Sequence, residues 1–306
     1  MNGNWSTYVI ALVALNIVGC VILLWKTART SPGDAPADQT GHVWDGDITE
    51  YNKPLPRWWI NLFYLTILFT IGYLVWFPGL GNLAGTAHWS SQSQHAADKA
   101  AADARLAAAL APYDGKPIDQ LAQDPHALAL GKAVFASRCA ACHGSGGQGA
   151  VGFPNLTDEI WHWSGDPDAV TETVLHGRAA VMPAWADTLT GMGGATAVDD
   201  VIAYVQSLGG IAGAKPDAAA VARGTPLFAG ICAACHGATA KGNALLGAPD
   251  LTDSYWLYGS SPQVLREGLT KGRGGIMPAH APLIGETRAR LAAAYAWSLS
   301  KSHLVQ

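Results

Sequence analysis

Charged and apolar residues are unevenly distributed along the chain, and two long stretches contain no Lys, Arg, Asp or Glu. Trp5 to Trp25 covers 21 residues, and Trp58 to Phe77 covers 20. At a helical rise of about 1.5 Å per residue, each stretch would span about 30 Å, the thickness of the hydrocarbon core of a membrane. Tryptophans stand at the ends of both stretches, as is typical of membrane interfaces. The pattern predicts two transmembrane helices, within residues 1–25 and 58–78.

Two alternatives to this interpretation are a signal peptide for the first stretch and a buried pair of core helices for both. The first stretch has no basic segment before it, and Lys26 to Arg29 follow it in place of a small-residue cleavage site. We therefore favour two membrane spans.

The cations near these spans predict their orientation. Four lie in the connecting segment 26–57, whereas residues 1–4 contain none and the next cation after Phe77 is Lys99. The positive-inside rule therefore places residues 26–57 in the cytoplasm, with both termini and everything after about Pro78 outside. Residues 79–125 begin Gly-rich and continue as an Ala-rich run, Ser93 to Leu110, so we expect a tether that contains a short helix.

Composition narrows the class of protein. The 306 residues are 49% apolar and only 14% charged, which excludes a disordered chain and indicates a membrane segment or a large apolar ligand. A net charge of −4 offers no basic surplus, so we expect no nucleic-acid partner.

Four of the five cysteines form a duplicated motif, Cys139-Ala-Ala-Cys142-His143 and Cys232-Ala-Ala-Cys235-His236. Cysteines three apart on one helical turn face the same side, so both can form thioethers to one porphyrin while the adjacent histidine ligates the iron. A single copy could equally be half of a zinc site or a redox dithiol. Two copies in a segment expected outside the cytoplasm favour two covalently bound haem c groups.

The duplication extends beyond the cysteines. Pro154-Asn155-Leu156-Thr157-Asp158 recurs as Pro249-Asp250-Leu251-Thr252-Asp253, and Met182-Pro183-Ala184 recurs as Met277-Pro278-Ala279. We therefore expect two tandem domains, 126–213 and 214–306.

This arrangement resembles class I cytochrome c, in which a methionine some 40 residues after the motif is the second axial ligand. Here Met182 follows His143 by 39 residues, and Met277 follows His236 by 41. The resemblance implies an all-α fold with His143, Met182, His236 and Met277 as axial ligands. By default each methionine would serve the haem of its own domain, although Met192 is a competitor for the first haem and core packing is the alternative role for both methionines.

Other polar residues divide by whether they repeat. Arg178 and Arg273 occupy matched positions, so each could pair with a haem propionate or with a backbone carbonyl of the methionine loop, or be an ordinary surface cation. His162, His176 and His280 have no histidine counterparts, and we interpret them as surface or packing residues.

The formal charge also differs between the two repeats. It is −5 over residues 126–213 and +4 over residues 214–306. Opposite signs could steer different partners to the two haems or hold the domains together, or they could describe only solvated surfaces.

A more specific resemblance comes from the connecting segment. Residues 41–59, GHVWDGDITEYNKPLPRWW, resemble the stretch before the membrane helix in the dihaem subunit of cbb3-type cytochrome c oxidases. Asp47 looks inserted relative to that pattern, and the first span occurs in only some members.

The resemblance implies an electron-transfer subunit without a catalytic site of its own. It would accept electrons from a soluble cytochrome c and pass them through a monohaem subunit to the haem-copper catalytic subunit. Such a chain would lie in the bacterial inner membrane, with its haem domains periplasmic. Neither predicted span contains a histidine for haem b or copper. The alternatives are the cytochrome subunit of another membrane redox complex, a free tethered carrier, and a haem sensor or peroxidase, which the matched methionines disfavour.

Overall fold

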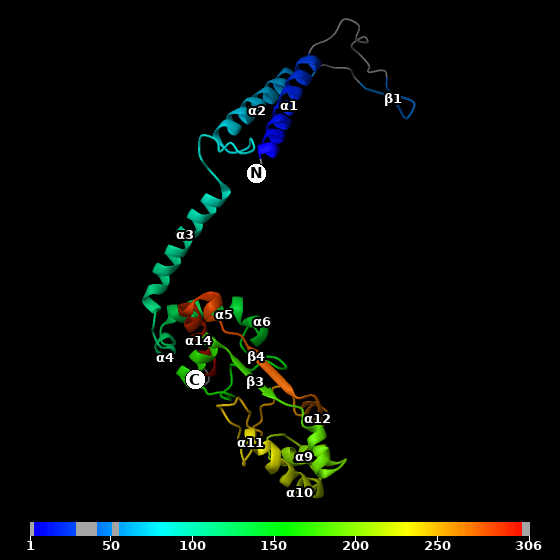
Figure 1. Cartoon of the computed structure of the whole chain (residues 1–306), viewed down its shortest axis with the longest axis vertical. Coiled ribbons are helices and arrows are strands. Elements are labelled where there is room, and N and C mark those ends of the chain that lie inside the picture. The colour runs from blue at the N-terminus through cyan, green and yellow to red at the C-terminus, as the bar shows by residue number, and fades with distance from the viewer. Residues whose placement is uncertain (1–2, 29–41, 51–54, 302–306) are drawn as a thin grey trace. The chain divides into compact units, whose positions relative to one another are not determined.

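The computed structural model describes residues 3–28, 42–50 and 55–301. The chain divides into two compact units, residues 1–106 and 107–306, and both are mostly helical (Figure 1).

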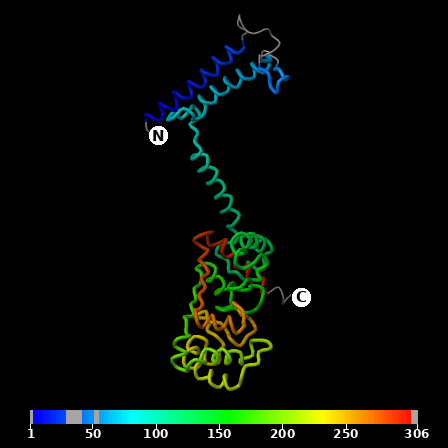
Figure 2. Tube along the Cα trace, turned by 90° about the vertical axis from the view of Figure 1, so that its right-hand side faces the viewer, coloured from blue at the N-terminus to red at the C-terminus, as the bar shows by residue number. Residues whose placement is uncertain are grey.

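The first unit contains the two long apolar helices expected from the hydrophobic pattern. They are α1 (Gly3–Thr27) and α2 (Arg57–Trp76), which lie side by side in both views (Figures 1 and 2). The backbone N–H of Asn82 donates to Ser6 Oγ at 2.8 Å, so the segment after α2 returns to the end where α1 begins. Most side chains of both helices are exposed although they are apolar, as a lipid-facing helix requires.

A short hairpin and a long polar helix make up the rest of this unit. The hairpin pairs β1 (Val43–Trp44) with β2 (Ile48–Thr49). Helix α3 (Ser91–Leu110) confirms the prediction of a helix in the Ala-rich tether, and it begins two residues earlier than expected.

The second unit contains the two cysteine motifs. Before the first strand lie η1 (Ala111–Tyr113), α4 (Ile118–Leu121), α5 (Pro125–Arg138), α6 (Ala140–His143) and α7 (Pro167–His176). Strand β3 (Arg178–Met182) leads to α8 (Ala186–Gly193), α9 (Ala197–Ser207), α10 (Ala218–Leu227), a π-helical turn η2 (Phe228–Cys232), α11 (Ala233–His236) and α12 (Pro262–Lys271). Strand β4 (Arg273–Met277), α13 (Ala281–Ile284) and α14 (Glu286–Lys301) complete the unit.

Two hydrophobic cores divide this unit into lobes. The first core contains residues of α4, α5, α7, α13 and α14, and the second contains residues of α8, α9, α10, η2 and α12. We call residues 107–177 with 278–301 the first lobe, and residues 183–272 the second lobe. Strands β3 and β4 pair antiparallel along their full length, from Arg178↔Met277 to Met182↔Arg273, and form a ribbon through which the chain passes between the lobes (Figure 1).

Each lobe is centred on a close crossing of two helices. In the first lobe α5 crosses α14 where Gly131 meets the backbone of Leu291, and Phe135 stacks on Tyr295 with ring centroids 5.3 Å apart. In the second lobe α10 crosses α9 where Gly224 meets the backbone of Asp200, and Phe228 packs on Tyr204 at 4.9 Å. The absence of a Cβ lets the two backbones approach closely.

The packing exchanges parts between the sequence repeats. The last helix of the first repeat, α9, packs on the first helix of the second repeat, α10, while α14 packs back on α5. Each core therefore contains segments from both sides of the expected boundary at residues 213 and 214.

The all-α expectation misses the two short sheets. Gly177 and Gly272, both at positive φ, end α7 and α12, and the following five residues run extended into the ribbon. Five residues are too few for a clear two-residue hydrophobic period, so the strands were not predicted.

The exchange also redistributes the charge. The first lobe contains six cations and nine anions, and the second contains five cations and seven anions, with Arg178 and Arg273 in the ribbon between them. Both lobes are mildly acidic. The idea that oppositely charged repeats steer different partners is therefore wrong for the packed lobes.

The glycine at the first crossing yields a stability test. In an exposed helix Gly→Ala stabilises by about 0.5–1 kcal/mol, but at Gly131 the new methyl would clash with the Leu291 carbonyl. We expect Gly131→Ala to lower the free energy of unfolding of the solubilised chain by about 1–3 kcal/mol, measured by denaturant titration. Gly191→Ala, on α8 with open space around it, is the matched control and should be neutral or stabilising. Equal effects would refute the close crossing.

An ion pair beside the second crossing is acid-sensitive. Asp200 is buried and accepts hydrogen bonds from Arg223 Nε at 3.0 Å and Nη2 at 2.7 Å, and from Thr196 Oγ1 at 2.9 Å. The Arg223 hydrogen bonds hold the pKa of Asp200 below its usual value. This pair therefore contributes stability above the unfolded-state pKa of aspartate, and the contribution is lost as pH falls through the folded-state pKa.

We expect Arg223→Gln to be less stable than the unmodified chain at pH 7, with the difference shrinking as pH falls below about 4. Denaturation midpoints measured across that range check the sign. Arg266→Gln, which removes the neighbouring exposed pair with Asp199, is the control and should change stability by less than about 0.5 kcal/mol. A difference that grows on acidification would contradict this assignment.

Candidate functional site

The first cysteine motif lies at the end of α5. Asp124 caps this helix, its carboxylate accepting from the backbone N–H groups of His126 and Ala127. Cys139 follows α5, and α6 carries Cys142 and His143 on the next turn. Cys139 is half-buried and Cys142 is exposed, as two ends of a ligand at the protein surface would require.

The second motif has the same arrangement with a different approach. Pro226 lies inside α10 and lacks an N–H, and the helix passes into a π-helical turn in which Ala233 N donates to Phe228 O. Cys232 is half-buried and Cys235 exposed, as in the first motif.

Both motif histidines are oriented by the same backbone contact. His143 Nδ1 lies 3.0 Å from the Pro154 carbonyl oxygen, and His236 Nδ1 lies 3.0 Å from that of Pro249. Since a carbonyl only accepts, Nδ1 must carry the proton, which leaves Nε2 with a free lone pair for a metal. Burial lowers the pKa of His236, so this imidazole stays neutral, as an iron ligand must.

The loops after the motifs hold these carbonyls in place. Gly149 N donates to His143 O at 2.7 Å, and Gly242 N donates to His236 O at 2.8 Å. Further along, Asn155 and Asp250 each accept from the backbone and hydroxyl of the threonine two residues later. The repeated landmarks of the sequence thus form a repeated scaffold for the histidine.

The electrostatics of the cysteines argue against the alternatives for CxxC. Burial raises the pKa of Cys139 and of Cys232 to about 11, so both stay protonated at neutral pH before any attachment. Redox dithiols and thiolate metal sites need a lowered pKa. Among the described residues no cluster of His, Cys, Asp and Glu could hold a metal ion on its own.

The methionines lie with the opposite repeat. Met277 packs on the first core, with Trp161, and Met182 packs on the second, with Cys232 and Trp256. This packing does not follow the default that each methionine stays in its own domain.

Glycine contacts fix this exchange. Gly177, at the end of α7, lies against the backbone of Met277 to Ala279, and Gly272, at the end of α12, lies against that of Met182 to Ala184. Backbone hydrogen bonds continue the contact, from His280 N to Val174 O at 3.1 Å and from Trp185 N to Leu269 O at 2.7 Å. The end of each repeat's helix therefore supports the methionine segment of the other repeat.

Met192 is not placed as a ligand would be. Its side chain is 56% exposed on α8, whereas Met182 and Met277 are half-buried against the cores.

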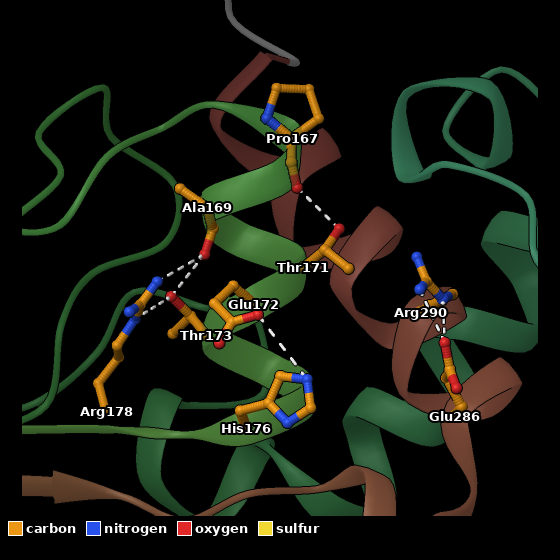
Figure 3. Close-up of polar contacts among 9 residues, drawn as sticks. All are labelled: Pro167, Ala169, Thr171, Glu172, Thr173, His176, Arg178, Glu286 and Arg290. Carbon is orange, nitrogen blue, oxygen red and sulfur yellow. Dashed lines mark hydrogen bonds and ion pairs between the residues drawn. The ribbon is translucent and has the colours of Figure 1, made fainter.

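Arg178 and Arg273 contact the helices before them and not the methionine loops. Arg178 Nε donates to Thr173 Oγ1 at 3.0 Å and Nη2 to Ala169 O at 3.4 Å, both on α7 (Figure 3). Arg273 Nη2 donates to Val264 O on α12 at 2.9 Å. The carbonyls they bond are therefore helical ones, which corrects the expected loop carbonyl.

Each arginine also stacks on an aromatic ring that the sequence analysis missed. Arg178 lies 4.8 Å from the ring of Trp163, and Arg273 lies 4.6 Å from that of Tyr258. The two rings share the 95-residue offset of the later landmarks, so a search for repeated aromatic positions would have found them. They brace the ends of the ribbon.

The unrepeated histidines take the packing and surface positions expected of them. His176 is exposed and lies 3.7 Å from Glu172 one turn earlier on α7 (Figure 3). His162 packs on Tyr255, whose hydroxyl accepts from Asn155 N at 2.9 Å. Burial lowers the pKa of His162 against the opposing effect of Asp253 and Asp158.

The residues present fit haem c. Each lobe has two cysteine thiols one helical turn apart, an imidazole with Nε2 available, a thioether from the ribbon and a tryptophan against the core. In the first lobe, buried His280 Nδ1 has no hydrogen-bond partner among the described residues, so a polar group of a bound ligand could satisfy it.

Comparison with known families gives matches along most of the chain. The family described as "N-terminal domain of cytochrome oxidase-cbb3, FixP" matches residues 37–84. The family described as "Cytochrome C oxidase, cbb3-type, subunit III" matches twice, at residues 126–205 and 219–295.

Individual relatives cover nearly the whole chain. A cbb3-type cytochrome c oxidase subunit CcoP from Rubrivivax gelatinosus is 40% identical over 304 residues, which is 99% of this chain and 97% of that protein. A FixP subunit from Bradyrhizobium sp. (strain ORS 278) is 40% identical, covering 85% and 93%. A CcoP subunit from Cereibacter sphaeroides is 36% identical, covering 90% and 98%.

Proposed function

The chain belongs to the CcoP/FixP family of cbb3-type cytochrome c oxidase subunits, and on that premise we propose that it is the membrane-anchored dihaem subunit that brings electrons into the oxidase. It accepts them from a soluble cytochrome c and relays them through a monohaem subunit to the haem-copper catalytic subunit. The observation that carries the proposal is the pair of CxxCH motifs, each with its histidine oriented and a half-buried methionine in the adjacent core.

The proposed cofactors are two covalently bound haem c groups. Cys139 and Cys142 hold the first haem, and Cys232 and Cys235 hold the second. His143 and Met277 are the axial ligands of the first iron, and His236 and Met182 those of the second. The crosswise assignment of the methionines is supported by their packing on the opposite repeat's core.

The protein's own residues control what such a group can do. Bound haem supplies one-electron redox chemistry. The Pro154 and Pro249 carbonyls fix the tautomer and ring orientation of the two histidines. The soft thioethers fill the sixth positions and favour the ferrous state, so a filled site passes electrons and excludes substrate.

The proposed topology has two membrane spans, α1 and α2. Both helices are long and apolar enough to cross a bilayer, and the Ser6 to Asn82 contact supports a shared exit side for the first residues and the tether. Residues 26–57 are then cytoplasmic, and the haem lobes, 126–213 and 214–306 as sequence repeats, are periplasmic in the inner membrane. By length and composition Ala218–His236 also qualifies as a span, but it holds the second haem motif and contributes to the second core.

The crosswise ligand pairs can be tested in a chain with one haem. In a Cys139→Ala/Cys142→Ala background only the second haem is attached. Adding Met182→Ala should open that haem to carbon monoxide in the reduced protein at neutral pH, whereas adding Met277→Ala should not. Absorbance spectra with and without the gas report this directly.

Ligation within each repeat would reverse the two results. The reciprocal background, Cys232→Ala/Cys235→Ala, provides the second arm. There Met277→Ala should admit carbon monoxide and Met182→Ala should not.

The oxidase assignment is tested by gentle solubilisation and affinity purification of this chain. We expect a histidine-rich subunit with haem b to co-purify, and cytochrome c-driven oxygen consumption to fall at least tenfold with His143→Ala or His236→Ala. Purification as a stable dihaem protein without any haem b would instead favour a free tethered carrier.

A further inference from the structure

The hairpin in the connecting segment is a built element that the electron-transfer role does not use. Its register pairs Val43 with Thr49 and Trp44 with Ile48. The turn places Asp45 (φ 51°) and Gly46 (φ 89°) in the left-handed region and closes with a hydrogen bond from Asp47 N to Trp44 O at 3.3 Å. Asp-Gly is a favoured pair for such a turn, so the sequence specifies this hairpin.

The register gives the hairpin two different faces. Trp44 and Ile48 lie opposite each other and therefore share one face, and Trp44 Nε1 donates to Glu50 Oε1 at 3.1 Å on that same side. Val43 and Thr49 form the other face. We call Trp44, Ile48 and Glu50 the tryptophan face.

The tryptophan face leaves much apolar surface in water. Trp44 and Ile48 are each 57% exposed. A hairpin with two residues in each strand cannot bury enough surface to be stable alone, and three or more strands or a packed surface are normally needed. An ordered hairpin of this size with an exposed tryptophan indicates a surface onto which it docks.

Charge selects the kind of surface. Residues 42–50 contain Asp45, Asp47 and Glu50 and no Lys or Arg. Among the ion pairs of the described residues, none involves Asp45 or Asp47. Anionic lipid headgroups of the cytoplasmic leaflet would repel such a hairpin. The cytoplasmic loops of a multi-spanning membrane protein carry an excess of Lys and Arg and would attract it.

We propose that the tryptophan face docks on a basic cytoplasmic loop surface of another membrane subunit of the oxidase and thereby joins this chain to the complex on the side opposite its haems. The inference rests on the proposed function, because it takes the connecting segment to be cytoplasmic and the chain to be an oxidase subunit. Trp44 and Ile48 bury apolar surface in the contact, and Asp45 and Asp47 select its partner.

A photo-crosslinking amino acid placed at each face tests the docking. Benzoylphenylalanine replaces Ile48 on the tryptophan face, or Thr49 on the other face as the matched control, in the full chain within membranes. On irradiation we expect position 48 to cross-link to another oxidase subunit at least fivefold more than position 49, identified by mass spectrometry of the shifted band. Equal cross-linking from both positions, or cross-links only to lipid, would overturn the proposal.

A second pair of variants tests the chemistry. Trp44→Ala should lower recovery of the haem b subunit on affinity purification at least fivefold. Asp45→Asn/Asp47→Asn should lower it too and make it less dependent on salt, because asparagine keeps the left-handed turn and removes both charges. Recovery equal to that of the unmodified chain in both variants would refute the docking.

The oxidase assignment itself is judged separately. Haem c content of each variant should be unchanged, since the hairpin lies outside the haem lobes. The unmodified chain must recover haem b for the comparison to be made, and its failure to do so would count against the proposed function and, with it, the hairpin's partner.

Discussion

Two helix crossings in which a glycine admits the backbone of its neighbour determine how the extramembrane unit is built. At Gly131 and Gly224 the chains approach so closely that a single methyl would not fit, and an aromatic pair one turn later completes each contact. The helices joined there come from different repeats. Everything between them, including the β3–β4 ribbon and the two methionines at its ends, must therefore cross from one lobe to the other.

The crossing places the parts of each site under shared control. The histidine and cysteines of a lobe come from one repeat, and the methionine segment that packs beside them comes from the other. Gly177 and Gly272 hold these segments by backbone contact, and the arginine after each glycine ties the ribbon to the preceding helix. A disturbance at either end of the ribbon is therefore felt in both lobes, since the two strands share five paired positions.

Much of this architecture could be read from the sequence, because it depends on local patterns. The uncharged stretches predict α1 and α2, the Ala-rich run predicts α3, and the CxxCH spacing places Cys139 to His143 on one helical turn. The pairing of repeats could not be read in the same way. Gly131 and Gly224, Phe135 and Phe228, and Tyr295 and Tyr204 are equivalent residues, so each helix could make the same contacts with its own repeat or with the other. The partners of Arg178 escaped prediction for a related reason, since Thr173 has no distinctive motif and becomes a partner only through the helix that presents it.

The exchange of C-terminal helices also orders the events by which the chain can fold. Leu291 follows Gly131 by 160 residues, whereas Gly224 follows Asp200 by only 24. The second lobe thus closes a short loop, and the first lobe closes a loop that spans nearly the whole exported segment, the slower process. During export from the N-terminus the first haem motif emerges early, yet its lobe cannot close until the last helix has followed it across the membrane. That open interval keeps the first motif accessible to the haem attachment machinery while the second lobe assembles.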